Sequence, residues 1–206
     1  MLHYETIEPS TLELLKGLML EPLLKETRLV GGTALALQLG HRSSINLDLF
    51  GHFDCDDIQL RTMLATHGQL QVINCTANVK MFTINDIKVD VVNYDSPWID
   101  DMVRDEGIRL ASVSEIAAMK IRAVIGRGTR KDFVDLYFLL QQYSLHQLMD
   151  LFHEKYPDVN DFIAIRSLTY FDDAEQIPMP LMRNATSWET MKKYINEQVK
   201  VFCNHL

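Results

Sequence analysis

The chain has 206 residues, enough for one large domain or two small ones, and its hydrophobic content of 47% excludes a disordered protein. No stretch approaches the roughly 18 uncharged apolar residues that a membrane helix needs, and the first residues lack the basic and apolar regions of a signal peptide. A formal net charge of -8 argues against a protein that coats nucleic acid, but it is compatible with one small basic site.

The cysteines Cys55, Cys75 and Cys203 are odd in number and far apart in the sequence. They have neither the spacing of metal ligands nor that of a disulfide framework. We therefore expect a protein of a reducing, cytoplasmic compartment.

The first half of the chain is expected to form a mixed sheet with helices, because short apolar runs alternate with turn signals. Ser10 to Glu13 has the form of a capping box, after which a helix is predicted. The predicted helices cover about residues 10–24, 33–39 and 57–67. The predicted strands cover about residues 28–30, 45–50, 70–74, 79–84 and 87–92, with a hairpin turn at Asn85 and Asp86.

The second half is expected to be helical, beginning with another capping box from Ser112 to Glu115. The predicted helices cover about residues 114–125, 130–142, 145–156, 161–170 and 187–202. This order predicts an α+β (or α/β) domain over residues 1–111, followed by a helical domain over residues 112–206 that completes the cleft of the first.

A glycine turn and a strand with polar side chains suggest a phosphate and metal site. Gly31 and Gly32 let backbone N–H groups approach phosphate oxygens closely. Asn46 and Asp48 stand at i and i+2 on a predicted strand, so their side chains point to the same face and can share Mg²⁺. A glycine pair before a helix is common, so neither feature is decisive alone.

Asp90 is the candidate for the third ligand, because a carboxylate from a neighbouring strand completes such a site. It lies in a β-branched run, and Lys88 shares its face of the strand. The alternative is that Asp90 is a solvated residue on the outer face of the sheet. Its combination with the glycine turn and Asp48 favours the metal site.

Lys120 lies on a predicted helix among apolar neighbours at the i±3 and i±4 positions. Such a lysine either contacts an anion, here a phosphate or an active-site carboxylate, or extends its ammonium to the surface at the domain boundary. We favour the anion.

Lys120 also begins a locally basic stretch that has no acidic residue before Asp132 and that suits a triphosphate or the end of an RNA. Lys131 and Asp132 are second candidates within it. Asp132 is equally explained by its place in the first turn of a helix, where the helix dipole favours a negative charge. The stretch comprises Lys120, Arg122, Arg127, Arg130 and Lys131.

Several segments resemble the AbiEii/AbiGii abortive-infection toxin family of the polymerase-beta-like nucleotidyltransferase superfamily. The main one, LVGGTALALQLGHRSSINLDLF, runs from Leu29 to Phe50. The glycine pair and the Asp-x-Asp element mark the superfamily, and the loop with His41 and Arg42 narrows it. The similarity continues through the segments at 88–90, 118–120, 130–135 and 170–175.

The resemblance implies a toxin of a type IV toxin–antitoxin system that transfers a nucleotide from an NTP to an acceptor, such as the 3′ end of an RNA (tRNA), with Mg²⁺ or Mn²⁺ as cofactor. A cognate antitoxin is the implied protein partner. Gly31, Gly32, Thr33, Arg42 and Lys120 would bind the nucleotide, although His41 and Arg42 serve equally well to tie down their loop. The implied metal ligands are Asn46, Asp48 and Asp90, and the implied catalytic residues are Asp48, Asp90, Lys120, Lys131 and Asp132.

The chain departs from the family pattern at Asn46, where the family usually has Asp. An amide oxygen still coordinates a hard cation, but it carries no charge and binds more weakly. The alternative function is therefore a catalytically weakened domain that binds a nucleotide or a partner. The acidic residues Asp172, Asp173 and Glu175 are expected to be structural, and Trp98 and Trp188 to be packing residues.

Overall fold

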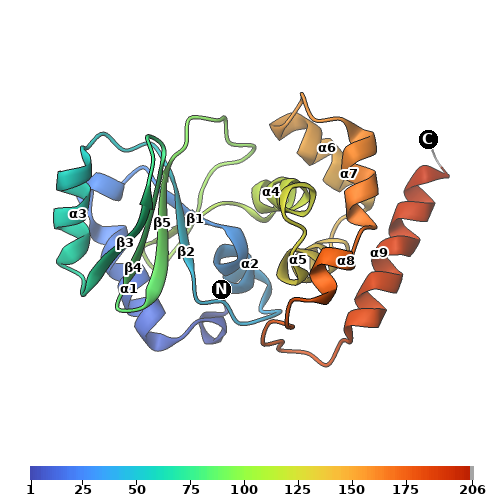
Figure 1. The fold of residues 1–206 in the computed structure, drawn as a ribbon, viewed down its shortest axis with the longest axis horizontal. Coiled ribbons are helices and arrows are strands. Elements are labelled where there is room, and N and C mark those ends of the chain that lie inside the picture. The colour runs from blue at the N-terminus through green and yellow to red at the C-terminus, as the bar shows by residue number, and fades with distance from the viewer. Residues whose placement is uncertain (205–206) are drawn as a thin grey trace. The chain divides into compact units, whose positions relative to one another are not determined.

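The structure, a computed structural model, describes residues 1–204, which form two compact units. The first unit comprises Met1–Pro97 with Asp101–Ser112, and it holds the sheet. The second comprises Trp98–Asp100 together with the chain from Val113 onward, and it is helical (Figure 1). The predicted order of a mixed sheet followed by a run of helices is confirmed.

The sheet has seven strands in the order β3-β4-β5-β2-β1-β7-β6. Its parallel pairs are β2 with β5 and β1 with β7, and the other neighbours are antiparallel. The strands are β1 (Arg28–Val30), β2 (Leu47–Gly51), β3 (Leu70–Cys75), β4 (Val79–Ile84), β5 (Ile87–Asn93), β6 (Val103–Asp105) and β7 (Ile108–Leu110).

The two faces of the sheet differ because polar and apolar residues alternate along β2 and β5. Leu47, Leu49, Val89 and Val91 are buried. They share their face with Lys80 of β4, whose ammonium pairs with α3, so this face is covered by α3 (Figure 1). The helices of the first unit are η1 (Tyr4–Thr6), α1 (Pro9–Leu20), η2 (Pro22–Leu24), α2 (Gly31–Leu39) and α3 (Asp57–Ala65).

The predicted capping box at Ser10 is wrong. Helix α1 begins at Pro9, with Glu8 as the N-cap residue, because the fixed φ of proline suits the first helical position. The helix also ends at Leu20 rather than near Leu24. Glu21, the residue before Pro22, is held in an extended conformation with φ -69° and ψ 124°.

Strands β6 and β7 form a hairpin that the hydrophobic pattern did not predict. The turn between them has positive φ angles at Glu106 (45°) and Gly107 (82°). Strands of three residues are too short to show a periodic pattern, so only the glycine signalled this turn.

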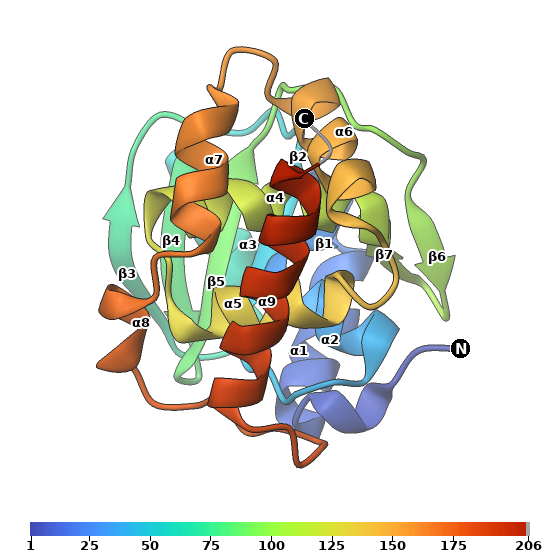
Figure 2. The ribbon, with the colours of Figure 1, turned by 90° about the vertical axis from the view of Figure 1, so that its right-hand side faces the viewer.

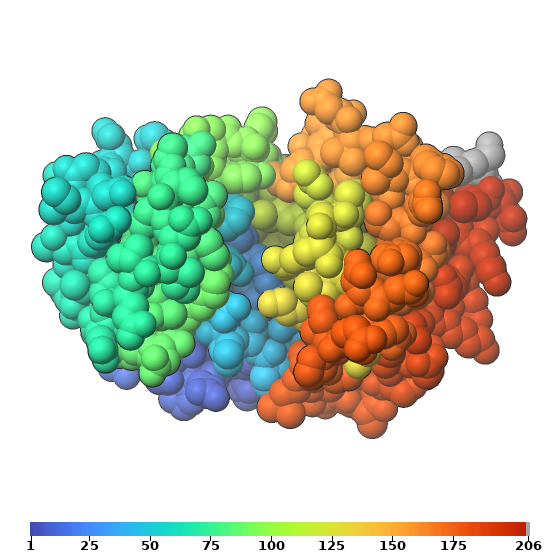
Figure 3. Space-filling model, viewed as in Figure 1, coloured from blue at the N-terminus to red at the C-terminus, as the bar shows by residue number. Residues whose placement is uncertain are grey.

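In the helical unit, α9 packs against α5, α6 and α7 (Figure 2). Phe133, Phe171 and Trp188 are buried and contact one another in tilted and edge-to-face arrangements, which confirms Trp188 as a packing residue. Figure 3 shows α7 and the short α8 at the surface of this unit. Its helices are α4 (Val113–Gly126), α5 (Arg130–Leu139), α6 (Leu145–Lys155), α7 (Asp161–Leu168), α8 (Asp172–Glu175) and α9 (Trp188–Cys203).

Within residues 1–204, none of the helices has both the length and the apolar character needed to cross a membrane.

Candidate functional site

Asp48 and Asp90 lie side by side in the centre of the sheet. They are directly paired in the register of the parallel strands β2 and β5. Both alternate with buried apolar residues, and both are themselves only half-buried. The structure thus brings together the two carboxylates that the sequence analysis placed on neighbouring strands.

The glycine turn lies against the Asp48 carboxylate. Gly31 has a φ of +69°, which L-residues with a side chain rarely adopt. A Cβ atom added to Gly31 would lie 2.5 Å from Oδ2 of Asp48, closer than any real contact. The positive φ favours glycine here, and any side chain at this position would displace the Asp48 carboxylate.

Helix α2 starts at this turn, so Gly31, Gly32 and Thr33 provide its first backbone N–H groups. These groups have no partner within the helix. The N-cap residue is Val30, whose apolar side chain cannot accept a hydrogen bond from them. A helix N-terminus next to a carboxylate is suited to bind an anion only if a cation lies between the two negative groups.

The side chain of Thr33 serves the local structure. Its hydroxyl donates a hydrogen bond to the carbonyl oxygen of Asn46 and lies 2.7 Å from the hydroxyl of Ser44. These contacts hold the segment that precedes β2 against α2. They fix the backbone of Asn46, the half-buried residue directly before the strand.

One carboxylate oxygen of Asp90 is paired with Lys88, which lies two residues earlier on the same face of β5. The ammonium of Lys88 forms an ion pair with Oδ2 of Asp90. The other oxygen, Oδ1, is buried and has no hydrogen-bond partner. A buried carboxylate oxygen without a protein partner is costly, so this oxygen is available to a cation.

These donors fit a hard divalent cation, which prefers carboxylate and amide oxygens. The unpartnered Oδ1 of Asp90 is the observation that supports this fit. No group of three His, Cys, Asp or Glu residues in the described part of the chain could hold a metal ion. The neutral Asn46 would therefore have to supply the third protein ligand beside Asp48 and Asp90.

The loop between α2 and β2 is held down by buried side chains. His41 and Arg42 are both 3% exposed. One guanidinium N–H of Arg42 donates to the carbonyl oxygen of Ser43 at 3.0 Å. This contact agrees with a role in tying down the loop, and a phosphate contact by Arg42 stays a prediction.

Lys120 lies in the interior of the helical unit, between two carboxylates of α5. Its ammonium is 3.2 Å from Oδ1 of Asp132 and 2.6 Å from Oδ2 of Asp135. All three side chains are almost completely buried. The expected anionic partner of Lys120 is thus present within the same unit, and a contact with a phosphate remains a prediction.

Asp132 is held by further donors at the start of α5. Arg127 donates to both of its oxygens, at 2.8 and 2.9 Å. Thr129, the N-cap residue, completes a capping box with it. Burial alone would raise the pKa of Asp132, but the hydrogen bonds from Arg127 and the charges of Lys120 and Arg127 hold that pKa well below its usual value.

The sequence analysis did not identify Arg127 as the partner of Asp132. The available signal was a basic residue just before a Thr-x-x-Asp cap, which is a weak one. Lys131, the neighbouring candidate, is exposed on the first turn of α5.

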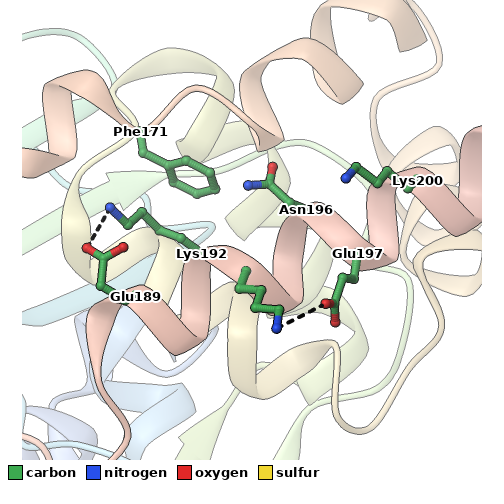
Figure 4. A pocket seen from close by; sticks show the side chains of 7 residues that line it. Phe171, Glu189, Lys192, Asn196, Glu197 and Lys200 are labelled. Atoms are coloured by element: carbon green, nitrogen blue, oxygen red, sulfur yellow. Dashed lines mark ion pairs between the residues drawn. The ribbon is translucent and has the colours of Figure 1, made fainter.

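Among the acidic residues of α8, Glu175 has a structural role, as expected. Glu175 accepts hydrogen bonds from the indole of Trp188 at 3.0 Å and from Lys192 at 2.6 Å, and it pairs with Arg130. A groove beside α9 adjoins this cluster (Figure 4). Lys192 and Lys193 in the groove pair with Glu189 and Glu197, so the groove does not concentrate one sign of charge.

The comparison with known families agrees with this geometry. The sequence model of the family described as "Nucleotidyl transferase AbiEii toxin, Type IV TA system" matches residues 13–201. The chain therefore belongs to the AbiEii nucleotidyltransferase toxin family, and the resemblance drawn from the glycine and Asp-x-Asp segments is confirmed. A toxin of this family implies a cognate antitoxin.

One curated protein and two solved structures are similar to this chain at low sequence identity. The protein aq_aa25 of Aquifex aeolicus is 29% identical over 180 residues, which are 84% of this chain and 86% of that one. JHP933 from Helicobacter pylori is 17% identical with a TM-score of 0.55, over 97% of this chain and 94% of that one. MenT4, a nucleotidyltransferase toxin from Mycobacterium tuberculosis, is 14% identical with a TM-score of 0.59, over 92% and 82% of the two chains.

Proposed function

We propose that this chain transfers a nucleotide from an NTP to an acceptor hydroxyl at the site formed by the Gly31 turn, Asp48 and Asp90. The acceptor oxygen forms a bond to the α-phosphorus while the bond from that phosphorus to pyrophosphate breaks. The observation that carries the proposal is the direct pairing of Asp48 with Asp90, with the Asp48 carboxylate against the glycine turn that starts α2.

The residues of the first unit hold the reactants in this proposal. The backbone N–H groups of Gly31, Gly32 and Thr33 bind the triphosphate. Asp48 and Asp90, with the amide oxygen of Asn46, hold Mg²⁺ or Mn²⁺, which neutralises phosphate charge when bound. The carboxylate of Asp48 lies so close to the turn that a phosphate there would be repelled without such a cation.

Lys120 is proposed to neutralise the charge that develops on the leaving pyrophosphate. This role follows from the family resemblance. The same resemblance makes Lys131 and Asp132 second candidates for catalytic residues. The 3′ end of an RNA such as a tRNA is the proposed acceptor, because related toxins modify that end. The local basic stretch around Lys131 suits a polyanion in an otherwise acidic chain.

Transfer is tested by incubating the protein with total RNA, Mg²⁺ and each of the four labelled NTPs. The wild type should label RNA, and Asp48→Ala should abolish labelling. Asp57→Ala is a matched control, since Asp57 is a half-exposed carboxylate of α3 that pairs with Lys80 of β4 and lies outside the proposed site. Equal labelling by the wild type and Asp48→Ala would show that the assigned site is wrong.

A nucleotide- or partner-binding domain with little activity is the second candidate, and Asn46 is the residue that favours it. Two carboxylates and one neutral amide attract a divalent ion less strongly than three carboxylates. Asp48-dependent binding of NTP without any labelling of RNA or protein would support this second function.

Restoring the family carboxylate should strengthen the site. We expect Asn46→Asp to lower the Mg²⁺ concentration needed for half-maximal labelling by roughly tenfold, because it adds a negative charge next to the ion. The measurement is RNA labelling over a range of Mg²⁺ concentrations. If the wild type is fully active and Asn46→Asp gains nothing, then Asn46 is already an adequate ligand.

A further inference from the structure

We infer that the ammonium of Lys88 takes the place of a second divalent ion, so that the site of this chain holds one metal ion. This inference rests on the proposed function, because it concerns the number of ions that Asp48 and Asp90 bind. Lys88 is therefore a positioning residue of the site, which acts through the carboxylate of Asp90.

The charges available at the site are too few for two ions. Neighbouring divalent ions repel each other, and several carboxylates are needed to offset this repulsion. Here Asp48 and Asp90 are the only carboxylates paired across β2 and β5 in the described register, and Asn46 is neutral. A single ion matches this donor set better than a pair.

The position of Lys88 supports the same conclusion. Leu47 of β2 is paired with Val89 of β5. The residues directly before them are Lys88, which lies in β5, and Asn46, which immediately precedes β2. In the two segments that lead to Asp48 and Asp90, this chain thus has a neutral amide, where the family usually has a carboxylate, and one lysine that pairs with Asp90.

The two carboxylate oxygens of Asp90 have different surroundings, which suit one lysine and one metal ion. Oδ2 is paired with the Lys88 ammonium, and Oδ1 is buried without a partner. A metal ion on Oδ1 would satisfy the second oxygen and leave the ion pair intact. A second divalent ion on Oδ2 would have to displace the ammonium against the repulsion between the two cations.

The number of ions is measured directly with Mn²⁺. Binding to the full chain is followed by electron paramagnetic resonance, in which two neighbouring Mn²⁺ ions give a spin-coupled signal that one ion cannot give. We expect one uncoupled Mn²⁺ per wild-type chain. We expect Lys88→Met to bind that ion about tenfold more tightly, because a nearby positive charge is removed.

The second ion should appear only when the cation is removed and a carboxylate is added. The double variant Asn46→Asp with Lys88→Met should therefore bind two coupled ions, whereas Asn46→Asp alone and Lys88→Arg should each bind one. Lys80→Met is the matched control: Lys80 is a strand lysine in an ion pair, but it faces α3, and its replacement should leave Mn²⁺ binding unchanged.

A coupled pair of ions in the wild type would overturn the inference about Lys88, as would a single ion in the double variant. Unchanged Mn²⁺ affinity in Lys88→Met would also overturn it. Failure of the proposed function has a different signature, since Mn²⁺ binding would then be the same in Asp48→Ala as in the wild type.

Discussion

The contact between Gly31 and Asp48 is the residue-scale feature on which the site depends. The backbone of Gly31 must adopt a positive φ so that the chain turns from β1 directly into α2. The same turn leaves space for the Asp48 carboxylate, which occupies the position that a side chain at residue 31 would take. Conformation and close approach thus require the same residue.

Gly31→Ala should therefore lower the free energy of unfolding by more than the backbone strain alone would. We expect a loss of about 1 kcal/mol of unfolding free energy from the positive φ, a further loss from the collision with Asp48, and weaker Mn²⁺ binding. Gly107→Ala is the matched control, because Gly107 has a φ of +82° with no atom within 4 Å of the added Cβ. Urea unfolding and Mn²⁺ titration measure the two effects. Equal losses in both variants, with unchanged Mn²⁺ binding, would contradict the required contact.

The alternation of residues, together with the glycine turn, predicted that Asp48 and Asp90 lie on neighbouring strands and face the same way. Each carboxylate interrupts a β-branched or leucine-rich run, so its face and strand could be assigned from the sequence. The partners of Lys120 could not be assigned in the same way. Apolar neighbours showed that its charge needed an anion, but the choice of Asp132 and Asp135 depends on how α4 and α5 pack.

At the scale of elements, the start of α5 is a buried polar network. Lys120 and Arg127 balance the charges of Asp132 and Asp135, and Thr129 caps the helix. Networks of this kind are stable only while every member keeps its partner. We therefore expect the junction of α4 and α5 to be sensitive to single substitutions.

Asp132 should make stability depend on pH in the acidic range. Its pKa is lower in the folded chain than in the unfolded chain, so the folded state binds fewer protons and its stability rises with pH. This contribution is complete above the unfolded pKa of about 4 and is lost as the pH falls toward the folded pKa.

We expect Asp132→Asn to flatten this acid dependence and to cost about 3–5 kcal/mol near neutral pH, as does the loss of one partner from a buried ion pair. Asp173→Asn, at an exposed position in α8, is the control and should change neither quantity. The measurement is the free energy of unfolding in urea between about pH 2 and pH 7. A wild-type pH slope that persists in Asp132→Asn would mean that another group is responsible.

The hairpin of β6 and β7 anchors the end of the first unit through one arginine. The guanidinium of Arg109 is buried and donates to the carbonyl oxygens of Met19, Leu24 and Thr27 at 2.8, 3.0 and 2.8 Å. Met19 lies in the last turn of α1, Leu24 ends the short helix η2, and Thr27 directly precedes β1. Arg109 thus ties β7 to the chain that leads into β1.

Arg109→Met should destabilise the protein by about 3 kcal/mol or more, because three carbonyl oxygens lose a charged donor. Arg104→Met is a matched control, since Arg104 is paired with Arg109 across the hairpin but is exposed. The stabilities of the two variants are compared by thermal or urea unfolding. Similar losses in the two variants would show that the buried hydrogen bonds contribute little.

At the scale of the whole chain, the order of elements could be predicted because apolar residues recur with a clear periodicity in most strands and helices. The exceptions have physical causes. Strands β6 and β7 are too short to show alternation, and Pro9 and Pro22 set the ends of α1 more strongly than the apolar run did. The sequence could likewise indicate the carboxylates and the glycine turn, but not that Lys88 pairs with Asp90.

The metal and triphosphate site is tested most directly by a crystal soaked with Mn²⁺ and a non-hydrolysable NTP analogue. We expect an anomalous peak in contact with the carboxylates of Asp48 and Asp90 and the amide oxygen of Asn46, and a triphosphate at the N–H groups of Gly31 and Gly32. A bound nucleotide with no ion at Asp48 and Asp90, or an ion bound elsewhere in the chain, would contradict the proposed site.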